Sequence, residues 1–485
     1  MLIQTKYLSL LFLILTIIQS ISAQNVIYHG SGEEDVANSM VYHNNYYYIL
    51  GTTRKTDKSA TDYYVLKLHT NGSIDKEFVF GDAHRDVGKH IFVDDSGIYV
   101  LGKTWDGGFP NNDMYFTRLD FNGKQTWKKY YGSQKNDLGH KFIKTKDGGF
   151  AMAGFNRGVD DFGNVYLVKT DKNGEIEWEN NFGEKYIDHG FDVAENEANE
   201  LIIVGTKGGF FNPTTTHFHN HDADIYIIKT NSEGEEIWQK TYGGDGHDWA
   251  KKIINAPGGG YYVCGSTQSE GAGSFDFFLM KIDEDGNELW FKTYGGNDFD
   301  YGETVQLSAD NNLYLYGTSA SYSTNYKPDH LLVKTDLDGN FIWLSTYGGE
   351  DSDYGTAMVS TPDSGCVITG YTKNGDLGKT DIAFYKLSKN GDPQAVTYIQ
   401  PVNDSINQIQ VFPNPVKKKL SVIIDAKNDN IFDFIMFNTS GSLVYKKSIN
   451  SNVLNSIQFN LTPGLYIYSV RDNNKNIAGG KLVVR

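Results

Sequence analysis

Short apolar runs alternate with polar turns along residues 25–400, and this pattern repeats about every 52 residues. Each repeat holds four runs rich in Tyr, Val, Ile, Leu and Phe, which predicts four β-strands per repeat. A glycine marks the register of each copy, and it follows an aromatic residue in all copies except the first: Gly30, Gly81, Gly132, Gly183, Gly243, Gly295 and Gly348. Regular internal repetition of this length indicates an array of similar units.

Other positions recur in the same register. An Asp lies five residues after each glycine, at Asp35, Asp86, Asp137, Asp188, Asp248, Asp300 and Asp353. The third run of each repeat ends at an Asn-Gly, Asp-Gly or Glu-Gly turn, and these dipeptides predict type I′ hairpins. A hairpin requires antiparallel strands, which argues against a parallel β-solenoid. Seven units of four antiparallel strands predict an all-β fold, a seven-bladed β-propeller over residues 24–400.

Two segments compete to be the fourth strand of the last blade. Residues 25–29 end at Gly30 in the register of every other outer strand, and residues 394–400 follow the last hairpin at the usual distance. The local hairpin has the smaller loop-closure cost, but the N-terminal segment would join the two ends of the ring. We therefore expect the N-terminal segment to close the propeller.

The net charge of the chain and its N-terminal segment limit the functions that we expect. The chain of 485 residues has 44 Lys and Arg against 60 Asp and Glu, a formal charge of −16, which argues against a nucleic-acid partner. Residues 1–23 read as a signal peptide, with Lys6, an apolar stretch at 8–18, and Ser22-Ala23 before the cleavage point. No later stretch is apolar enough for a transmembrane segment. Cys264 and Cys366 are expected to be small buried hydrophobic residues rather than a disulfide.

Binding is expected on the propeller face that carries the loops between the second and third strands, because only these loops vary between repeats. Their aromatic residues are the candidate ligand contacts: Trp105, Phe109, Phe210, Phe211, Tyr322 and Tyr326. Flat aromatic rings among hydroxyl and amide groups suit sugar rings and protein partners equally well.

No cofactor is certain from the sequence, and Ca²⁺ and Zn²⁺ are the two metals considered. The insertion of the fourth repeat could bind Zn²⁺ through His217, His219, His221 and Asp222, although a solvated polar loop explains the same residues. The seven repeated Asp residues could form an acidic ring for Ca²⁺. They are better explained as structural acceptors that hold the turn before them, because one Asp recurs per blade in fixed register.

The repeat stops near residue 404, and alternating runs over 410–485 predict a small Ig-like β-sandwich after a linker at 401–409. Its motifs are Pro413-Asn414-Pro415 near the start, Gly464 and Tyr466, and Gly480-Lys481 at the end. This segment resembles the type A sorting domain of the type IX secretion system. The blades, which end in a W-x-x-x-[YF]-G-G pattern, resemble repeats of secreted bacterial propellers.

The resemblance implies a Gram-negative protein exported to the cell surface or medium, with the type IX translocon and its sorting protease as partners. The leading functional hypothesis is a binding or adhesion propeller whose ligand is a glycan or a protein. A secreted glycoside hydrolase or polysaccharide lyase acting from the same loop face is the enzymatic alternative, and a structural surface component is the third. Paired, desolvated carboxylates at one unrepeated site would favour the enzyme.

Overall fold

The computed structural model describes residues 26–30, 33–54, 60–81, 85–105, 113–158, 163–183, 187–208, 223–323, 326–373, 375, 379–394, 406–412, 416–426, 431–438, 443–472 and 475–484. These residues form β-strands joined by turns, and they contain no helix that could cross a membrane. The chain divides into two compact units, with the boundary after Gln394. Each unit is described by itself below.

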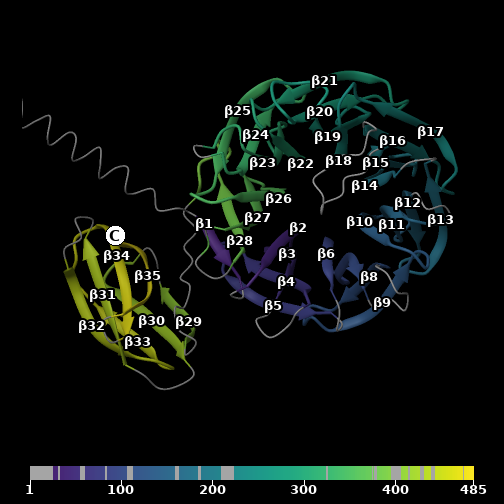
Figure 1. Cartoon of the computed structure of the whole chain (residues 1–485). Coiled ribbons are helices and arrows are strands. Elements are labelled where there is room, and N and C mark those ends of the chain that lie inside the picture. Colours follow the sequence, from purple (N-terminus) through teal and green to yellow (C-terminus); the bar gives the residue numbers. More distant parts are fainter. Residues whose placement is uncertain are drawn as a thin grey trace, which may run out of the picture. The chain divides into compact units, whose positions relative to one another are not determined.

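Seven four-stranded antiparallel sheets form a seven-bladed β-propeller, with the A strand of each blade beside the central axis and the D strand at the rim (Figure 1). The A strands are β2 (Asp35–His43), β6 (Val87–Asp94), β10 (Asp137–Lys144), β14 (His189–Glu195), β18 (Asp248–Asn255), β22 (Asp300–Leu307) and β26 (Asp353–Ser360). The B strands are β3 (Tyr46–Thr53), β7 (Gly97–Thr104), β11 (Phe150–Asn156), β15 (Leu201–Lys207), β19 (Tyr261–Thr267), β23 (Leu313–Ser319) and β27 (Cys366–Thr372). The C strands are β4 (Asp62–His69), β8 (Asp113–Leu119), β12 (Asn164–Thr170), β16 (Asp224–Thr230), β20 (Asp276–Ile282), β24 (Asp329–Thr335) and β28 (Asp381–Leu387). The D strands are β5 (Ile74–Phe80), β9 (Gln125–Tyr131), β13 (Ile176–Phe182), β17 (Glu236–Tyr242), β21 (Glu288–Tyr294), β25 (Phe341–Tyr347) and β1 (Val26–His29).

The core of the propeller lies between the blades. Every residue of strand β11 is buried, because both faces of a blade pack against its neighbours, whereas the rim strand β13 alternates half-buried and exposed positions. This is why the B and C strands read as nearly continuous apolar runs and the D strands do not. Cys264 and Cys366 are free and buried in this core, as predicted.

The propeller is closed by its N-terminal strand. Strand β1 pairs antiparallel with β28, joining Val26 to Tyr385 and His29 to Ile382, and completes the sheet of the seventh blade. Ile27 and His29 are buried there. The expected closure is therefore confirmed, and the ring is held by pairing between its first and last strands rather than by a local hairpin.

A repeated contact joins the rim of each blade to the next one. The rings of Trp127, Trp178, Trp238, Trp290 and Trp343 pack against the hairpin glycine of the following blade. Beside this contact, Tyr294 Oη donates a 2.6 Å hydrogen bond to the carbonyl oxygen of Gly339. The W-x-x-x-[YF]-G pattern therefore encodes an attachment between neighbouring blades.

The turns between C and D strands differ from the predicted type I′ form. Gly123 has φ +80°, but Asn122 is not among the residues with positive φ, so only one of the two residues is left-handed. Asp120 N–H bonds to the Lys124 carbonyl and Gly123 N–H to the Asp120 carbonyl, which makes a three-residue loop ending in a glycine bulge. Asp120 Oδ1 also accepts the Asn122 and Lys124 N–H groups at 2.9 Å, which stabilises this longer loop.

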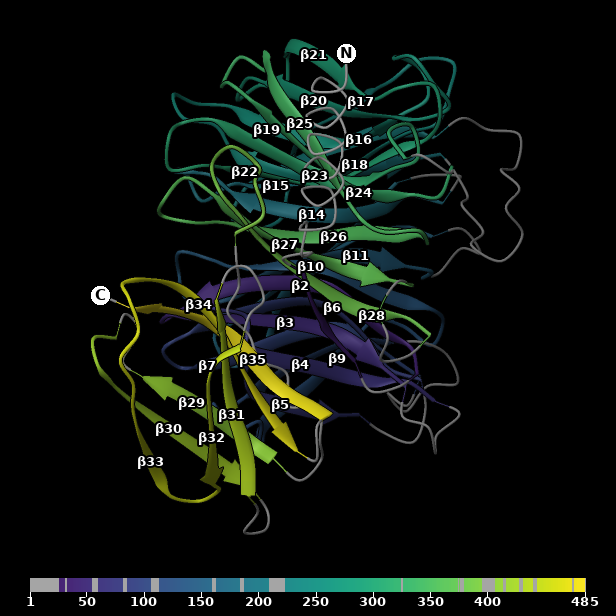
Figure 2. The same ribbon diagram turned by 90° about the vertical axis from the view of Figure 1, so that its left-hand side faces the viewer.

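The C-terminal unit is a two-layered β-sandwich, as predicted (Figure 2). One sheet has the order β29-β30-β33, built from β29 (Ile406–Phe412), β30 (Lys419–Ala426) and β33 (Leu454–Gln458). The other has the order β32-β31-β34-β35, built from β32 (Leu443–Asn450), β31 (Ile431–Asn438), β34 (Gly464–Asp472) and β35 (Lys475–Val484). Its core combines residues of both sheets, including Leu420, Phe434 and Tyr468.

Candidate functional site

The loops on one end of the propeller hold most of the predicted site residues. In antiparallel blades the B–C loops and D–A turns share this end, which we call the B–C face, and the A–B and C–D turns share the other. Trp105 is 48% exposed, and Tyr326 is 81% exposed with a left-handed φ of +61°. Seven other predicted loop residues lie outside the described residues: Phe109, Phe210, Phe211, His217, His219, His221 and Asp222. The described residues contain no cluster of metal ligands.

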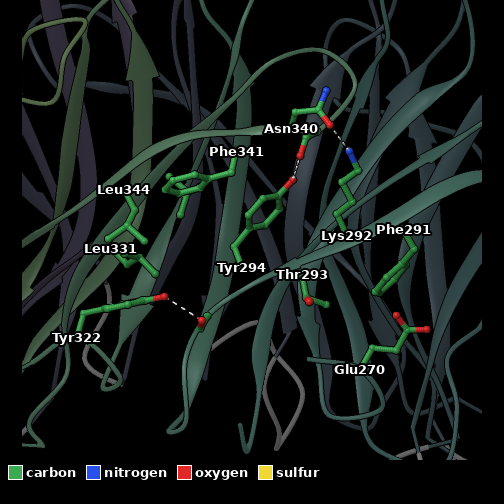
Figure 3. Close-up of a pocket in the computed structure, with 13 residues that line it drawn as sticks. Glu270, Phe291, Lys292, Thr293, Tyr294, Tyr322, Leu331, Asn340, Phe341 and Leu344 are labelled. Atoms are coloured by element: carbon green, nitrogen blue, oxygen red, sulfur yellow. Dashed lines mark hydrogen bonds between the residues drawn. The ribbon is translucent and has the colours of Figure 1, made fainter. Parts of the chain in front are cut away.

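Tyr322, also predicted, lines a cavity of about 700 Å³ between the rim strands of blades 5 and 6 (Figure 3). Its hydroxyl donates a 2.8 Å hydrogen bond to the carbonyl of Gly295. At the far end of the cavity Lys292 Nζ is already bonded to Asn340 Oδ1 at 2.8 Å, and Phe341 is 57% exposed. The cavity offers apolar surface, but its polar groups are largely engaged within the protein.

The repeated Asp residues lie at the junctions between blades. Among the described residues, the N–H of the repeated Asp donates at six junctions to the carbonyl that precedes the previous blade's C strand, for example from Asp300 to Phe275 at 2.7 Å. A Cβ atom built on Gly295 would lie 1.8 Å from Asp276 Oδ1 and 2.6 Å from Asp300 Oδ2. The register glycine thus sits between two carboxylates, which leaves no room for a side chain.

The A-strand carboxylates accept hydrogen bonds from the chain around them. Asp300 Oδ2 accepts Gly296 N–H at 2.8 Å and Ser321 Oγ–H at 2.7 Å. Asp248 makes the corresponding contacts with Gly244 N–H and with the Ser269 hydroxyl. These contacts tie the D–A turn to the start of the B–C loop.

Six of the seven junctions therefore pair two acidic groups that are buried or half-buried. Burial, and next the charge of Asp137, raise the pKa of Asp113 to about 6, and burial followed by Asp353 raises the pKa of Asp329 to about 6. The pairing recurs at the blade junctions, with Asn164 in place of one carboxylate. Paired carboxylates of this kind would indicate a hydrolase at a single site, but their repetition around the ring favours a role in joining the blades.

Residues that differ between blades lie one position after each repeated Asp, beside the propeller axis. This position is aliphatic in blades 1 to 3 and aromatic in blades 4 to 7: Val36, Val87, Leu138, His189, Trp249, Tyr301 and Tyr354. The rings of Trp249 and Tyr301 stack with centroids 6.0 Å apart, and Phe275 lies 4.8 Å from Trp249. Tyr354 stacks on Tyr371 at 4.9 Å. We call Trp249, Phe275, Tyr301, Tyr354 and Tyr371 the aromatic arc.

A second set of side chains comes from a β-bulge in every A strand. The pairing of β6 with β7 shifts between Gly88 and His90, which leaves Lys89 as the extra residue, and the other six blades have the same bulge. A bulge redirects the side chain of its extra residue. The extra residues are Asn38, Lys89, His140, Phe191, Lys251, Glu303 and Thr356.

These bulge residues interact across the ring. Burial, followed by the charges of Lys103 and Lys251, lowers the pKa of Lys89 to about 8, against a smaller opposing effect of Glu303. Lys89 belongs to blade 2, whereas Lys251 and Glu303 belong to blades 5 and 6. The Lys251 ammonium lies 4.1 Å from the ring centroid of Phe191. The axis therefore carries a mixed basic and aromatic surface, and Lys89, Lys103 and Lys251 are only partly buried.

The C-terminal unit is the part of the chain with a recognised family. Residues 410–485 match the secretion system C-terminal sorting domain. The last domain is a type IX sorting domain. Tyr466 of its G-x-Y motif is buried and donates a 2.8 Å hydrogen bond to the Thr462 carbonyl, whereas Pro413, Asn414 and Pro415 lie outside the described residues. Gly464 and the Gly480-Lys481 pair lie in the adjacent strands β34 and β35. The protein is a secreted β-propeller destined for the cell surface or the extracellular space.

Several solved structures are similar to the chain. The Neurospora crassa Pan2 WD40 domain has a TM-score of 0.47 at 9% identity, with 74% of this chain and 93% of that chain covered. YCF48 bound to D1 peptide has a TM-score of 0.42 at 9% identity, with 75% of this chain and 98% of that chain covered. Puromycin hydrolase has a TM-score of 0.46 at 10% identity, with 81% of this chain and 59% of that chain covered. No curated protein matches the chain. The evidence for seven blades is the strand pairing described above.

Proposed function

We propose that this secreted propeller is a binding or adhesion module that engages a glycan through its B–C face and axis. The observation that supports the proposal is the aromatic arc. Three of its rings, Trp249, Tyr301 and Tyr354, occupy a position that is aliphatic in blades 1 to 3. Rings that only filled space would be expected at this position in every blade, and Val36, Val87 and Leu138 occupy it instead in the first three. Trp249, Tyr301, Tyr354 and Tyr371 are partly exposed, whereas Phe275 is buried beside Trp249. Partly exposed aromatic faces are suited to pyranose rings.

The proposed export route has four parts. Residues 1–23 direct the chain across the inner membrane, residues 24–400 form the propeller, residues 401–409 link it, and residues 410–485 address it to the translocon. We propose that the sorting protease then removes the last domain. The loop residues Trp105, Phe109, Phe210, Phe211, Tyr322 and Tyr326 would extend the ligand contact beyond the axis.

A glycan array probed with the mature full chain tests this function. Trp249→Ala and Tyr301→Ala should each weaken binding of any captured glycan, because both rings belong to the aromatic arc. Tyr42→Ala is the matched control, since Tyr42 is an exposed aromatic residue beside the A–B turn of blade 1, on the opposite face. Thermal unfolding of all three variants separates lost contacts from lost folding. Binding that responds to Tyr42 but not to the arc, or a chain that captures only protein, would contradict the proposal.

A further inference from the structure

Positive charge gathers at the axis of an otherwise acidic protein. Lys89 and Lys251 are bulge residues of blades 2 and 5. Lys103 pairs with Val87, which lies two residues from both Lys89 and Arg85, and the charge of Lys103 lowers the pKa of Lys89. We call Arg85, Lys89, Lys103 and Lys251 the axial basic cluster. It lies in a chain whose formal charge is −16.

The axial basic cluster is not neutralised by neighbouring carboxylates. Within the described part of the chain none of its members forms an ion pair, although Glu303 is close enough to influence Lys89. The buried lysines of the C strands behave differently: Lys169 and Lys334 each bind an Asp carboxylate at 2.7 Å. Gathering like charges without partners reduces the stability of the folded protein, which is a recurrent property of binding sites.

The surroundings of the cluster define what could neutralise it. Phe191 lies against Lys251, and Trp249, two residues before Lys251, belongs to the aromatic arc. An ammonium group binds a carboxylate or sulfate, whereas the rings contact a flat apolar face. A sugar residue that carries an acidic group presents both features within one ring.

Resting on the binding function proposed above, we propose that the axis of the propeller binds an acidic saccharide, with Lys89, Lys103 and Lys251 contacting its carboxylate or sulfate groups and the aromatic arc contacting its rings. The partner is thus an anionic polysaccharide rather than a neutral glycan. Binding releases counterions from the polymer and weakens as salt increases, as for other polyanions.

The experiment uses the mature full chain and isothermal titration with four probes: a galacturonic acid oligomer, its methyl ester, a sulfated galactose oligomer, and polyglutamate. We expect binding of a carboxylated or sulfated oligomer but not of the neutral ester. Lys89→Met and Lys251→Met should each weaken that binding about tenfold or more, the loss that corresponds to one charge-assisted hydrogen bond. Lys172→Met, at an exposed lysine of the opposite face, should leave binding unchanged.

Thermal unfolding gives a second readout. Both axial variants should unfold at the same or a higher temperature than the parent protein, because they remove repulsion between like charges. If the methyl ester binds as tightly as the galacturonic acid oligomer, and this binding depends on Trp249, the proposal of an acidic saccharide is overturned. The glycan-binding function would then still stand. Binding of polyglutamate alone would overturn the saccharide in favour of an acidic peptide. Failure of both acidic oligomers would overturn the inference, and the glycan array still tests the broader function independently.

Discussion

Replacing Asp113 by Asn should stabilise the propeller at neutral pH. Asp113 is 1% exposed, and neither of its carboxylate oxygens has a hydrogen-bond partner among the described residues. Burial and the nearby charge of Asp137 raise its pKa to about 6. The blade that follows offers a natural precedent, because Asn164 occupies the same position beside Asp188.

The size and sign of this change in stability follow from the pKa of Asp113 in the folded and in the unfolded protein. Asp113 has a pKa of about 6 in the folded protein against 3.8 for an ordinary Asp, a difference of ~2 units or ~3 kcal/mol. Partial solvent screening reduces this to about 1–2 kcal/mol. Since the folded state holds the proton more tightly, the contribution of Asp113 to stability is greatest below about pH 4 and falls as the pH rises through about 6. Asn carries no charge, so the variant avoids this fall.

Urea unfolding of the mature chain near pH 8 and near pH 4, with and without added Ca²⁺, measures the effect. We expect Asp113→Asn to raise the free energy of unfolding by about 1–2 kcal/mol at the higher pH and to match the parent at the lower pH. Asp285→Asn is the control, because it removes the same charge from an exposed turn. Lower stability of Asp113→Asn near pH 8, together with Ca²⁺ stabilisation of the parent alone, would refute the reasoning and identify the pair as a cation site.

Three other changes test the contacts between blades, the closure of the ring and the role of the sorting domain. Asp300→Ala should lower the free energy of unfolding by about 1–2 kcal/mol, measured in urea, because the Gly296 N–H loses its acceptor. Removing residues 24–30 behind an intact signal peptide should lower the melting temperature of the whole propeller, whereas removing 395–400 should not; the reverse result would place the closing strand at the C-terminal end. Deleting 404–485 should leave a folded propeller in the periplasm, and cell fractionation that finds it at the surface would contradict the sorting role.

The blade architecture could be predicted from the sequence because each blade repeats the same few constraints. Gly295 is fixed by two carboxylates and Trp290 by the hairpin glycine Gly339 of the next blade. Constraints of this kind recur in register: the carboxylate pair occurs at six junctions and the Trp in five blades. The closure was also predictable, because the segment before Gly30 has the register of a rim strand. The fold and the ring closure could therefore be predicted from the repeats, and the sorting domain from its resemblance to a known family.

The axial site was not predicted, and the bulge explains why. Alternation along a strand places residues two apart on the same side, but the extra residue in each A strand breaks this rule. Lys89 and Lys251 therefore could not be placed beside the axis from the period of the sequence. The turns show the same limit: Asn122-Gly123 suggested a type I′ hairpin, but Asp120 stabilises a longer loop by accepting two N–H groups. A comparison of equivalent positions across the seven repeats would have shown the change from aliphatic to aromatic residues.

In a propeller built from similar repeats, side chains that recur around the ring need a different explanation from side chains that occur in a few blades. The paired carboxylates occur around the ring, so a single ligand cannot account for them, whereas contacts between blades can. Lys89, Lys251 and the aromatic arc occur in some blades only, and symmetry of the fold cannot account for them. Their partly exposed position beside the axis, and the absence of an ion pair for these lysines within the described residues, both carry a cost in stability. A bound anion that contacts several blades at once would offset that cost, and only a site on the axis is within reach of several blades.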